Sequence, residues 1–123
     1  NVGIEPQYIA KDAVLSNSLI TDGAKIEGTV INSIIGSSVV IKKGAVIKDS
    51  VIFANTVIGE DSIIEYSIID ENVVIGKGVH IGSPKADDVE IAVIGRDVTI
   101  DDGSIVKQGA NIEENVKNEG KEE

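Results

Sequence analysis

One histidine and one arginine are the residues of this chain whose chemistry stands out. His80 is the only histidine, and an imidazole can act as a general base toward a hydroxyl or amine group. Arg96 is the only arginine, and its planar guanidinium suits bidentate binding of a phosphate. Lys85 and the pair Lys42-Lys43 are weaker anion ligands, because charges at surface corners are usually just solvated. The chain thus offers one candidate base and a few candidate phosphate ligands.

These candidates also have simpler interpretations. No second base, acceptor site or CoA-binding signature accompanies His80, so we expect it to be an outward corner residue in solvent. One histidine cannot build a three-histidine metal site, and a chain without cysteine has no thiolate ligand or thiol nucleophile. For Arg96 the alternative is a surface charge paired with Asp97 or with a neighbouring part of the fold. We predict no catalytic residue and no metal site in this chain.

Four serines recur in equivalent contexts along the chain. A serine nucleophile needs an adjacent base, and no histidine or lysine accompanies the set. The recurrence favours corner packing and hydrogen bonds to the backbone instead. The Gly-Lys-Gly stretch at 76–78 lies inside the same repeat and is interpreted as a turn, not as a phosphate-binding loop. The four serines are Ser18, Ser33, Ser50 and Ser67.

A repeat of about six residues must position all of these side chains. Aliphatic residues recur mostly six apart, with a few shorter gaps, and a small residue often lies four places after each. Two inward positions per six residues indicate short strands separated by bends, not a helix of period 3.6. The aliphatic positions are Ile9, Leu15, Ile20, Ile26, Val30, Ile35, Ile41, Ile47, Ile52, Ile58, Ile64, Ile69, Ile75, Ile81, Ile94, Ile100, Val106 and Ile112.

Three such strands make one complete turn of a solenoid, which we call a coil. The regular coils repeat every 17 residues, and the four serines then fall in one column because the chain returns to the same place once per coil. Coils stacked at roughly 4.8 Å predict an all-β, three-sided parallel solenoid over residues 9–112, with Ile64 in its core. The six coils begin at Ile9, Ile26, Ile41, Ile58, Ile75 and Ile100.

Three segments depart from the repeat. Residues 82–93 are predicted to be a loop insertion in the fifth coil, and such loops often lie on a binding face. Residues 1–8, with Pro6, are interpreted as a linker from a missing N-terminal domain, since the chain lacks an initiator methionine. Residues 113–123 are too polar to continue the core and are expected to be a frayed tail.

Composition and charge narrow the classes of function. The 22 isoleucines and 16 valines among 123 residues favour a pleated sheet over a helical bundle. A formal net charge of −10 argues against a nucleic-acid groove or an anionic membrane surface as the main partner. No apolar run approaches the roughly 20 residues that span a bilayer. A cytoplasmic location fits these features.

The repeat resembles the hexapeptide motif of left-handed parallel β-helix proteins over residues 9–112. The left hand follows from this resemblance alone, because β-crossovers are usually right-handed. Within that superfamily the chain is similar to the C-terminal domain of bacterial glucose-1-phosphate adenylyltransferases, also called ADP-glucose pyrophosphorylases. The segments that carry this resemblance are 2–10, 17–20, 27–33, 48–52 and 91–95.

The resemblance implies a regulatory and oligomerisation domain. Members of that family make ADP-glucose and pyrophosphate from ATP and glucose 1-phosphate for glycogen synthesis, and the magnesium and ATP sites lie in a preceding catalytic domain that this chain lacks. The chain alone is therefore expected to be inactive and to need no cofactor. Its implied partners are its own catalytic domain, further subunits and a sugar-phosphate effector near Arg96 and Lys85.

Two alternatives stay open on the sequence. A stand-alone hexapeptide-repeat acyltransferase would use His80 as its base and the insertion beside its site. Another sugar-nucleotide pyrophosphorylase, of a different base or sugar, would share the fold and the mode of action.

Overall fold

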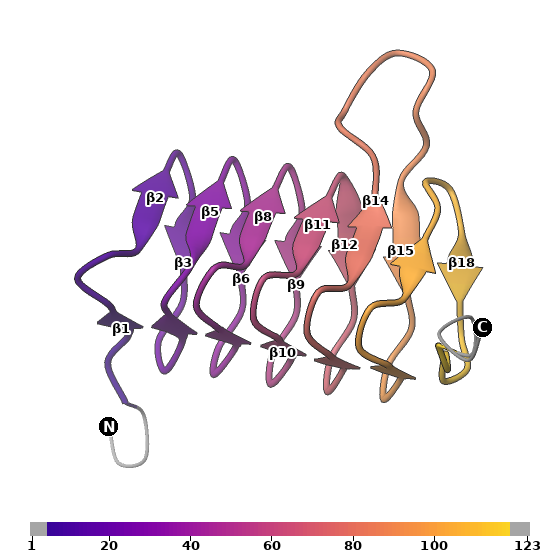
Figure 1. Ribbon diagram of the computed structural model, residues 1–123. Helices are drawn as coiled ribbons and strands as arrows, with labels where there is room; N and C mark the ends of the chain where they lie inside the picture. Colours follow the sequence, from indigo (N-terminus) through magenta and orange to yellow (C-terminus); the bar gives the residue numbers. More distant parts are fainter. Residues whose placement is uncertain (1–4, 119–123) are drawn as a thin grey trace.

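The computed structural model describes residues 5–118, which form eighteen short β-strands in three parallel sheets (Figure 1). Sheet A contains β1 (Tyr8–Ile9), β4 (Lys25–Ile26), β7 (Val40–Ile41), β10 (Val57–Ile58), β13 (Val74–Ile75) and β16 (Thr99–Ile100). Sheet B contains β2 (Val14–Ser16), β5 (Thr29–Ile31), β8 (Val46–Lys48), β11 (Ile63–Glu65), β14 (His80–Gly82) and β17 (Ile105–Val106). Sheet C contains β3 (Leu19–Ile20), β6 (Ile34–Ile35), β9 (Val51–Ile52), β12 (Ser67–Ile69), β15 (Ala92–Ile94) and β18 (Asn111–Ile112).

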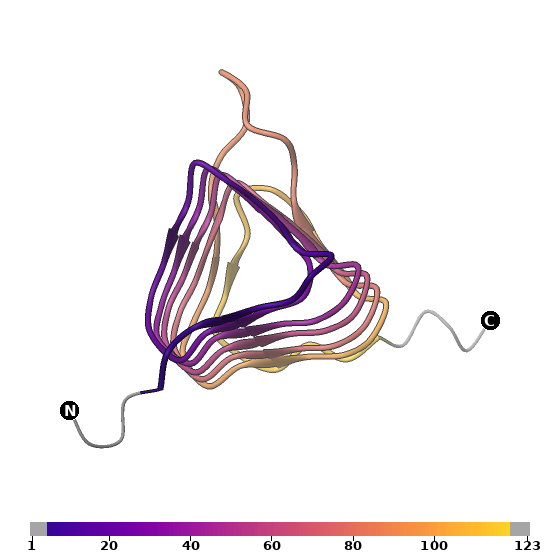
Figure 2. The ribbon, with the colours of Figure 1, turned by 90° about the vertical axis from the view of Figure 1, so that its left-hand side faces the viewer.

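Successive strands along the chain lie in sheets A, B and C in turn, so each coil contributes one strand to every side of a triangular column (Figure 2). Viewed from the N-terminal end, the chain turns counter-clockwise as it recedes, which makes the solenoid left-handed. In sheet A, Ile41 pairs with Ile58 and Ile58 pairs with Ile75. The predicted six-coil, left-handed parallel β-helix is confirmed.

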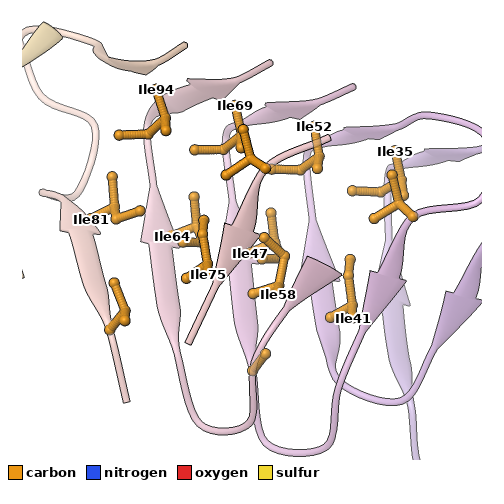
Figure 3. Close-up of a cluster of buried hydrophobic side chains, with 14 of the residues drawn as sticks. Ile35, Ile41, Ile47, Ile52, Ile58, Ile64, Ile69, Ile75, Ile81 and Ile94 are labelled. Atoms are coloured by element: carbon orange, nitrogen blue, oxygen red, sulfur yellow. The ribbon is translucent and has the colours of Figure 1, made fainter. Parts of the chain in front are cut away.

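The interior is a stack of isoleucines that the chain contributes at each coil (Figure 3). Ile64 is fully buried, as expected, and burying each such side chain stabilises the fold by about 1.5–3 kcal/mol. A single coil cannot cover these side chains, so the core exists only because the coils stack. The fully buried isoleucines are Ile26, Ile35, Ile41, Ile47, Ile52, Ile58, Ile64, Ile69, Ile75, Ile81, Ile94 and Ile100.

The corner between sheets B and C requires left-handed backbone in every coil. Asn17, Asn32 and Asp49 have φ angles of 49°, 50° and 52°, and short polar side chains tolerate this region better than other non-glycine residues. Tyr66 occupies the same place in the fourth coil with φ 48°, which is strained for a bulky side chain. In the fifth coil Gly82 has φ 83° there, and a Cβ atom would lie 2.0 Å from the Glu65 carbonyl oxygen.

The serine column forms as expected beside this corner. The backbone N–H groups of Ser33, Ser50 and Ser67 donate to the side-chain oxygen of the serine one coil earlier, at 3.1, 3.0 and 3.1 Å. Each hydroxyl in turn donates to the carbonyl two residues before it, for example Ser50 to Lys48 at 2.7 Å. The serines are therefore structural, as the absence of a base indicated.

The ends and the insertion differ in detail from their predicted bounds. The loop between β14 and β15 is 83–91, because Gly82 and residues 92–93 lie in strands, and it projects from the corner between sheets B and C (Figure 2). Tyr8 belongs to β1, while residues 1–4 of the expected linker and 119–123 of the expected tail lie outside the described residues.

Residues 113–118 are not frayed but cover the end of the column. Val116 pairs with Ile100 as a further parallel bridge, its N–H donates to Thr99 O, and it packs on the core. The Asn118 amide donates to the Asp102 carbonyl at 2.9 Å. Polar composition misled the prediction, since one aliphatic side chain with asparagine caps is enough to close the last coil. No helix in residues 5–118 is long and apolar enough to cross a membrane.

Candidate functional site

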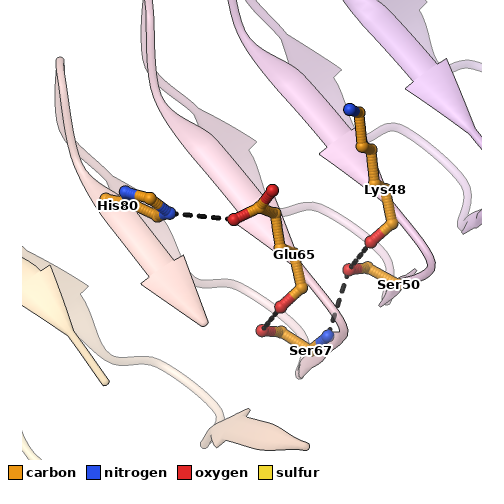
Figure 4. Close-up of polar contacts among 5 residues, drawn as sticks. All are labelled: Lys48, Ser50, Glu65, Ser67 and His80. Atoms are coloured by element: carbon orange, nitrogen blue, oxygen red, sulfur yellow. Dashed lines mark hydrogen bonds and ion pairs between the residues drawn. The ribbon is translucent and has the colours of Figure 1, made fainter. Parts of the chain in front are cut away.

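His80 lies on the outer face of sheet B, in β14, and not at a corner as predicted. Its Nε2 atom is 2.9 Å from Oε1 of Glu65 in β11, one coil earlier (Figure 4). The imidazole is 46% exposed and the carboxylate only 12%. A carboxylate at this distance can orient an imidazole through a hydrogen bond, which is how histidine bases are held in many enzymes. The pair is therefore the one acid–base arrangement that the fold assembles around the histidine.

Sequence reasoning missed Glu65 because the two residues are 15 positions apart and only coil stacking brings them together. The signal was available in the register, since β11 and β14 pair with Glu65 beside Gly82. The neighbours of His80 in its own row are apolar, with Ile63 on one side and Ile105, 76% exposed, on the other. The pair thus lies on an open face, and the nearest further polar side chain in these rows is Lys48, which pairs with Glu65 one coil earlier.

Arg96 lies at the exposed turn between β15 and β16, at the corner between sheets C and A. No carboxylate in residues 5–118 comes within 4.0 Å of it, so the expected pair with Asp97 or with a neighbouring coil is not formed there. It borders a hollow of about 480 Å³ together with Asp70, Asn111 and Glu113. Two carboxylates beside one guanidinium make this hollow an unfavourable place for an anion without further positive charge.

Lys85 lies on the loop 83–91, at the opposite rim of sheet C. Its Nζ atom is 5.9 Å from the centre of the Tyr66 ring, within the range of a cation–π contact. The structure therefore separates Arg96 and Lys85, which lie at two different corners of the triangular column. One copy of the chain does not bring both residues to a single phosphate.

An amide ladder runs along the corner below Lys85. The Asn17 side-chain amide donates to Asn32 Oδ1 at 2.6 Å, and the Asn32 amide donates to Asp49 Oδ1 at 3.4 Å. Two shallow hollows of about 370 and 330 Å³ adjoin this ladder and are lined on the other side by Leu19, Ile34 and Val51. The corner thus combines polar amides with an apolar wall.

The outer face of sheet C is the most uniformly apolar surface of the described residues. Its outward row reads Leu19, Ile34, Val51, Ile68 and Val93 in the first five coils, and only the sixth coil has a polar residue, Asn111. Sequence analysis did not single out this row, although each member directly precedes the inward aliphatic residue of its strand. The outward row was hard to recognise in the sequence, because its residues and the inward residues beside them are mostly the same types, isoleucine and valine.

Comparison with known proteins gives the chain a family context. The family model described as "GMPPB C-terminal domain" matches residues 14–117. A glucose-1-phosphate adenylyltransferase from Lachnospira eligens is 58% identical over 40 residues, which are 32% of this chain and 10% of that protein. Glucose-1-phosphate adenylyltransferases from Bacillus thuringiensis and Bacillus anthracis are each 37% identical over 109 residues, covering 89% of this chain. The chain spans 22% of the length of these Bacillus relatives.

A solved structure supports the fold independently. A mutant of GDP-perosamine N-acetyl transferase from Caulobacter crescentus, in complex with CoA and GDP-perosamine, superposes with a TM-score of 0.57 and 20% identity. The match covers 86% of this chain and 47% of that one. At this level of identity the likeness concerns the fold alone.

Proposed function

The chain belongs to the GMPPB C-terminal domain family, and from this premise we propose that it is the regulatory and oligomerisation domain of a glucose-1-phosphate adenylyltransferase. The observation that carries the proposal is the 37% identity to proteins of that name over 89% of this chain. The family model supports it as well, since it matches residues 14–117 and so covers nearly all of the solenoid.

The reaction proposed for the whole protein is adenylyl transfer. A phosphate oxygen of glucose 1-phosphate forms a bond to the α-phosphorus of ATP, the bond to the β-phosphate bridge breaks, and pyrophosphate leaves, with magnesium offsetting the negative charge. We assign this chemistry to the remainder of the protein, since this chain spans 22% of its Bacillus relatives. Within the described residues, Gly76, Lys77 and Gly78 form a corner turn of the solenoid, consistent with a non-catalytic domain.

The proposed effector role of Arg96 and Lys85 takes a specific form in this fold. Because the two residues lie at different corners of one copy, each would contact a sugar phosphate together with residues of another domain or another copy. A cytoplasmic location and the preceding catalytic domain belong to the same proposal.

The test is an activity assay on the full natural reading frame that contains this chain. We expect pyrophosphate release with ATP and glucose 1-phosphate, and none from the 123-residue chain alone. Preference for another nucleoside triphosphate or another hexose 1-phosphate would replace the proposal with the related pyrophosphorylase. A reading frame without any nucleotidyltransferase activity, across a panel of both substrates, would overturn it.

A second candidate, an acyltransferase, is favoured by one observation, the contact between His80 and Glu65. In that reaction the imidazole would remove the proton of a hydroxyl or amine as it attacks the acyl-CoA thioester, and CoA thiol would leave. Neither His80 nor Glu65 lines the hollows at the rims of sheet C, so no hollow beside the pair is available there for an acyl acceptor. The adenylyltransferase proposal is therefore better supported. Thiol release from acetyl-CoA that disappears in His80→Ala would favour this candidate instead.

A further inference from the structure

The outward row of sheet C has no charged side chain in the first five coils. Leu19 and Ile34 are 63% and 48% exposed, and Phe53, in the turn just after β9, is 43% exposed. The remaining members of the row, Val51, Ile68 and Val93, are partly exposed. A chain with 26% charged residues and a net charge of −10 has ample polar surface, so a five-coil row without a single charge marks an interaction surface.

Sheet C is also suited to flat packing. Figure 2 shows successive coils following the same triangular path, each slightly offset from the last, and the outward residues of sheet C pair from coil to coil without a break in register. Two such faces can pack against each other, as stacked sheets do at about 10 Å.

The charges at the rims of this face differ between the two ends of the column. One column at the corner between sheets C and A holds Asp22, Ser37, Ala54, Glu71 and Arg96. The carbonyl groups of the first four each accept a hydrogen bond from a backbone N–H one coil later, and Arg96 takes the same place after β15, since Ile94 pairs with Ile69. The first coil therefore presents a carboxylate at this rim, and the fifth coil presents the guanidinium.

We propose that a second copy of this chain packs on sheet C in an antiparallel two-fold arrangement, with the axis passing at Val51. Coil one of each copy then faces coil five of the other. Leu19 meets Val93 of the partner subunit, and Ile34 meets the partner's Ile68. The Phe53 rings meet near the axis, where aromatic pairs add to the burial of apolar area.

Charge complementarity selects the antiparallel orientation. In it, Asp22 of each copy faces the partner's Arg96, so each guanidinium group gains a carboxylate that residues 5–118 of its own chain do not place within 4.0 Å of it. In the parallel alternative, coil five faces coil five with opposite rims together, and Arg96 would approach the partner's Lys85. The antiparallel arrangement does bring the two Asp49 carboxylates toward each other at the other rim, where Lys85 of each copy borders the same hollow.

The size of the face predicts a weak dimer. With the axis at Val51, five coils of each copy face each other; at about 4.8 Å per coil they give a length of about 24 Å, and a side of roughly five residues gives a width of about 17 Å. Two such faces bury about 800 Å² in total, which is below the size of stable specific interfaces and in the range of weak, transient ones. We therefore expect dissociation in the micromolar range rather than an obligate dimer.

This inference deepens the oligomerisation part of the proposed function and is tested on the chain by itself. A failure here would leave the nucleotidyltransferase assignment untouched, and a failure of the activity assay would leave this interface untouched. The two outcomes are thus distinguishable.

The first experiment compares oligomeric state by sedimentation velocity at high micromolar concentration. The wild-type chain is expected to be a dimer, and Val51→Glu, which places two carboxylates at the axis, a monomer. Val40→Glu is the matched control, because Val40 occupies the outward row of sheet A in the same coil with similar exposure. Phe53→Asp replaces Val51→Glu if circular dichroism shows that variant unfolded. A monomeric wild type, or equal dissociation by Val40→Glu, would overturn the proposal.

The second experiment tests the orientation by charge reversal. Arg96→Glu and Asp22→Lys are each expected to weaken the dimer at least several-fold, and the double variant to restore it. In addition, Asp22→Cys mixed with Arg96→Cys should be joined by a short bis-maleimide, because the natural chain has no cysteine. A tighter dimer in Arg96→Glu, or no restoration in the double variant, would overturn the antiparallel arrangement.

Discussion

The hydroxyl oxygen of Ser33 accepts a hydrogen bond from the backbone N–H of Ser50 at 3.0 Å, although the two residues are 17 positions apart. The distance in sequence equals one coil, so this contact is a direct measure of the register. It also satisfies an N–H group that a sharp corner would otherwise leave buried without a partner. The same contact joins each neighbouring pair of serines in the first four coils.

Ser50→Ala should therefore lower the free energy of unfolding by about 2 kcal/mol. The Ser50 hydroxyl donates to Lys48 O at 2.7 Å and accepts from Ser67 N–H at 3.1 Å, and alanine leaves both groups without a partner. Urea denaturation measures the change. Ser37→Ala, in an exposed turn, serves as the control and should stay within about 0.5 kcal/mol. Equal effects of the two variants would contradict a structural role for the column.

Ile64→Asp should abolish cooperative unfolding. Ile64 is fully buried at the middle of the stack, and a carboxylate there has neither water nor a partner. Its neighbour Ile63 faces outward in the same strand, so Ile63→Asp should retain a sigmoidal melting curve in far-UV circular dichroism. A melting curve of Ile64→Asp that matches wild type would remove this residue from the core.

Tyr66→Asn should stabilise the chain by about 1 kcal/mol. Asparagine tolerates the φ angle of 48° better than tyrosine, and this gain exceeds the loss of the Lys85 contact. The reverse change, Asn32→Tyr, should destabilise it by a similar amount and break the amide ladder. Urea midpoints compare the two variants. Destabilisation by Tyr66→Asn would show that the ring holds the loop more strongly than the backbone strain opposes it.

Arg96→Ala in the full-length enzyme should raise the concentration of sugar phosphate needed for half-maximal activation. Lys77→Ala is the control, because Lys77 is exposed at a different corner. The effects of Arg96→Ala and Lys85→Ala should add, since the residues lie at separate corners. Light scattering on the same samples separates a lost effector contact from a lost subunit contact. Unchanged activation by every sugar phosphate tested would refute the effector role of Arg96.

The coils were predictable because the period of 17 residues and the serine column both report on a chain that returns to the same place. Burial of Ile41, Ile58 and Ile75 on one side follows from that period alone. The candidate site was harder to predict from the sequence. Contacts such as Glu65 with His80 join outward side chains of different coils, which the period of the aliphatic residues does not pair, and they emerge only when the register is combined with the direction of each side chain.

The C-terminal cap shows a second limit. Residues 113–118 carry one aliphatic side chain among polar ones, and average polarity over the segment suggested disorder. The single contact of Val116 with the core and the backbone bonds to the last strand of sheet A outweigh that average. Segments that close a repeat need only one apolar residue, so composition is a poor guide to them.

The uniform register also makes the length of this column adjustable in whole turns. Val57 pairs with Val40 of the preceding coil, and Val40 pairs in the same way with Lys25. Removing residues 40–56 would therefore let β10 pair with β4 in place of β7. Removing six residues instead would rotate every later strand onto the adjoining side. The loop and Arg96 would then leave the two borders of sheet C, and the shortened chain would keep its core while presenting a different outer surface.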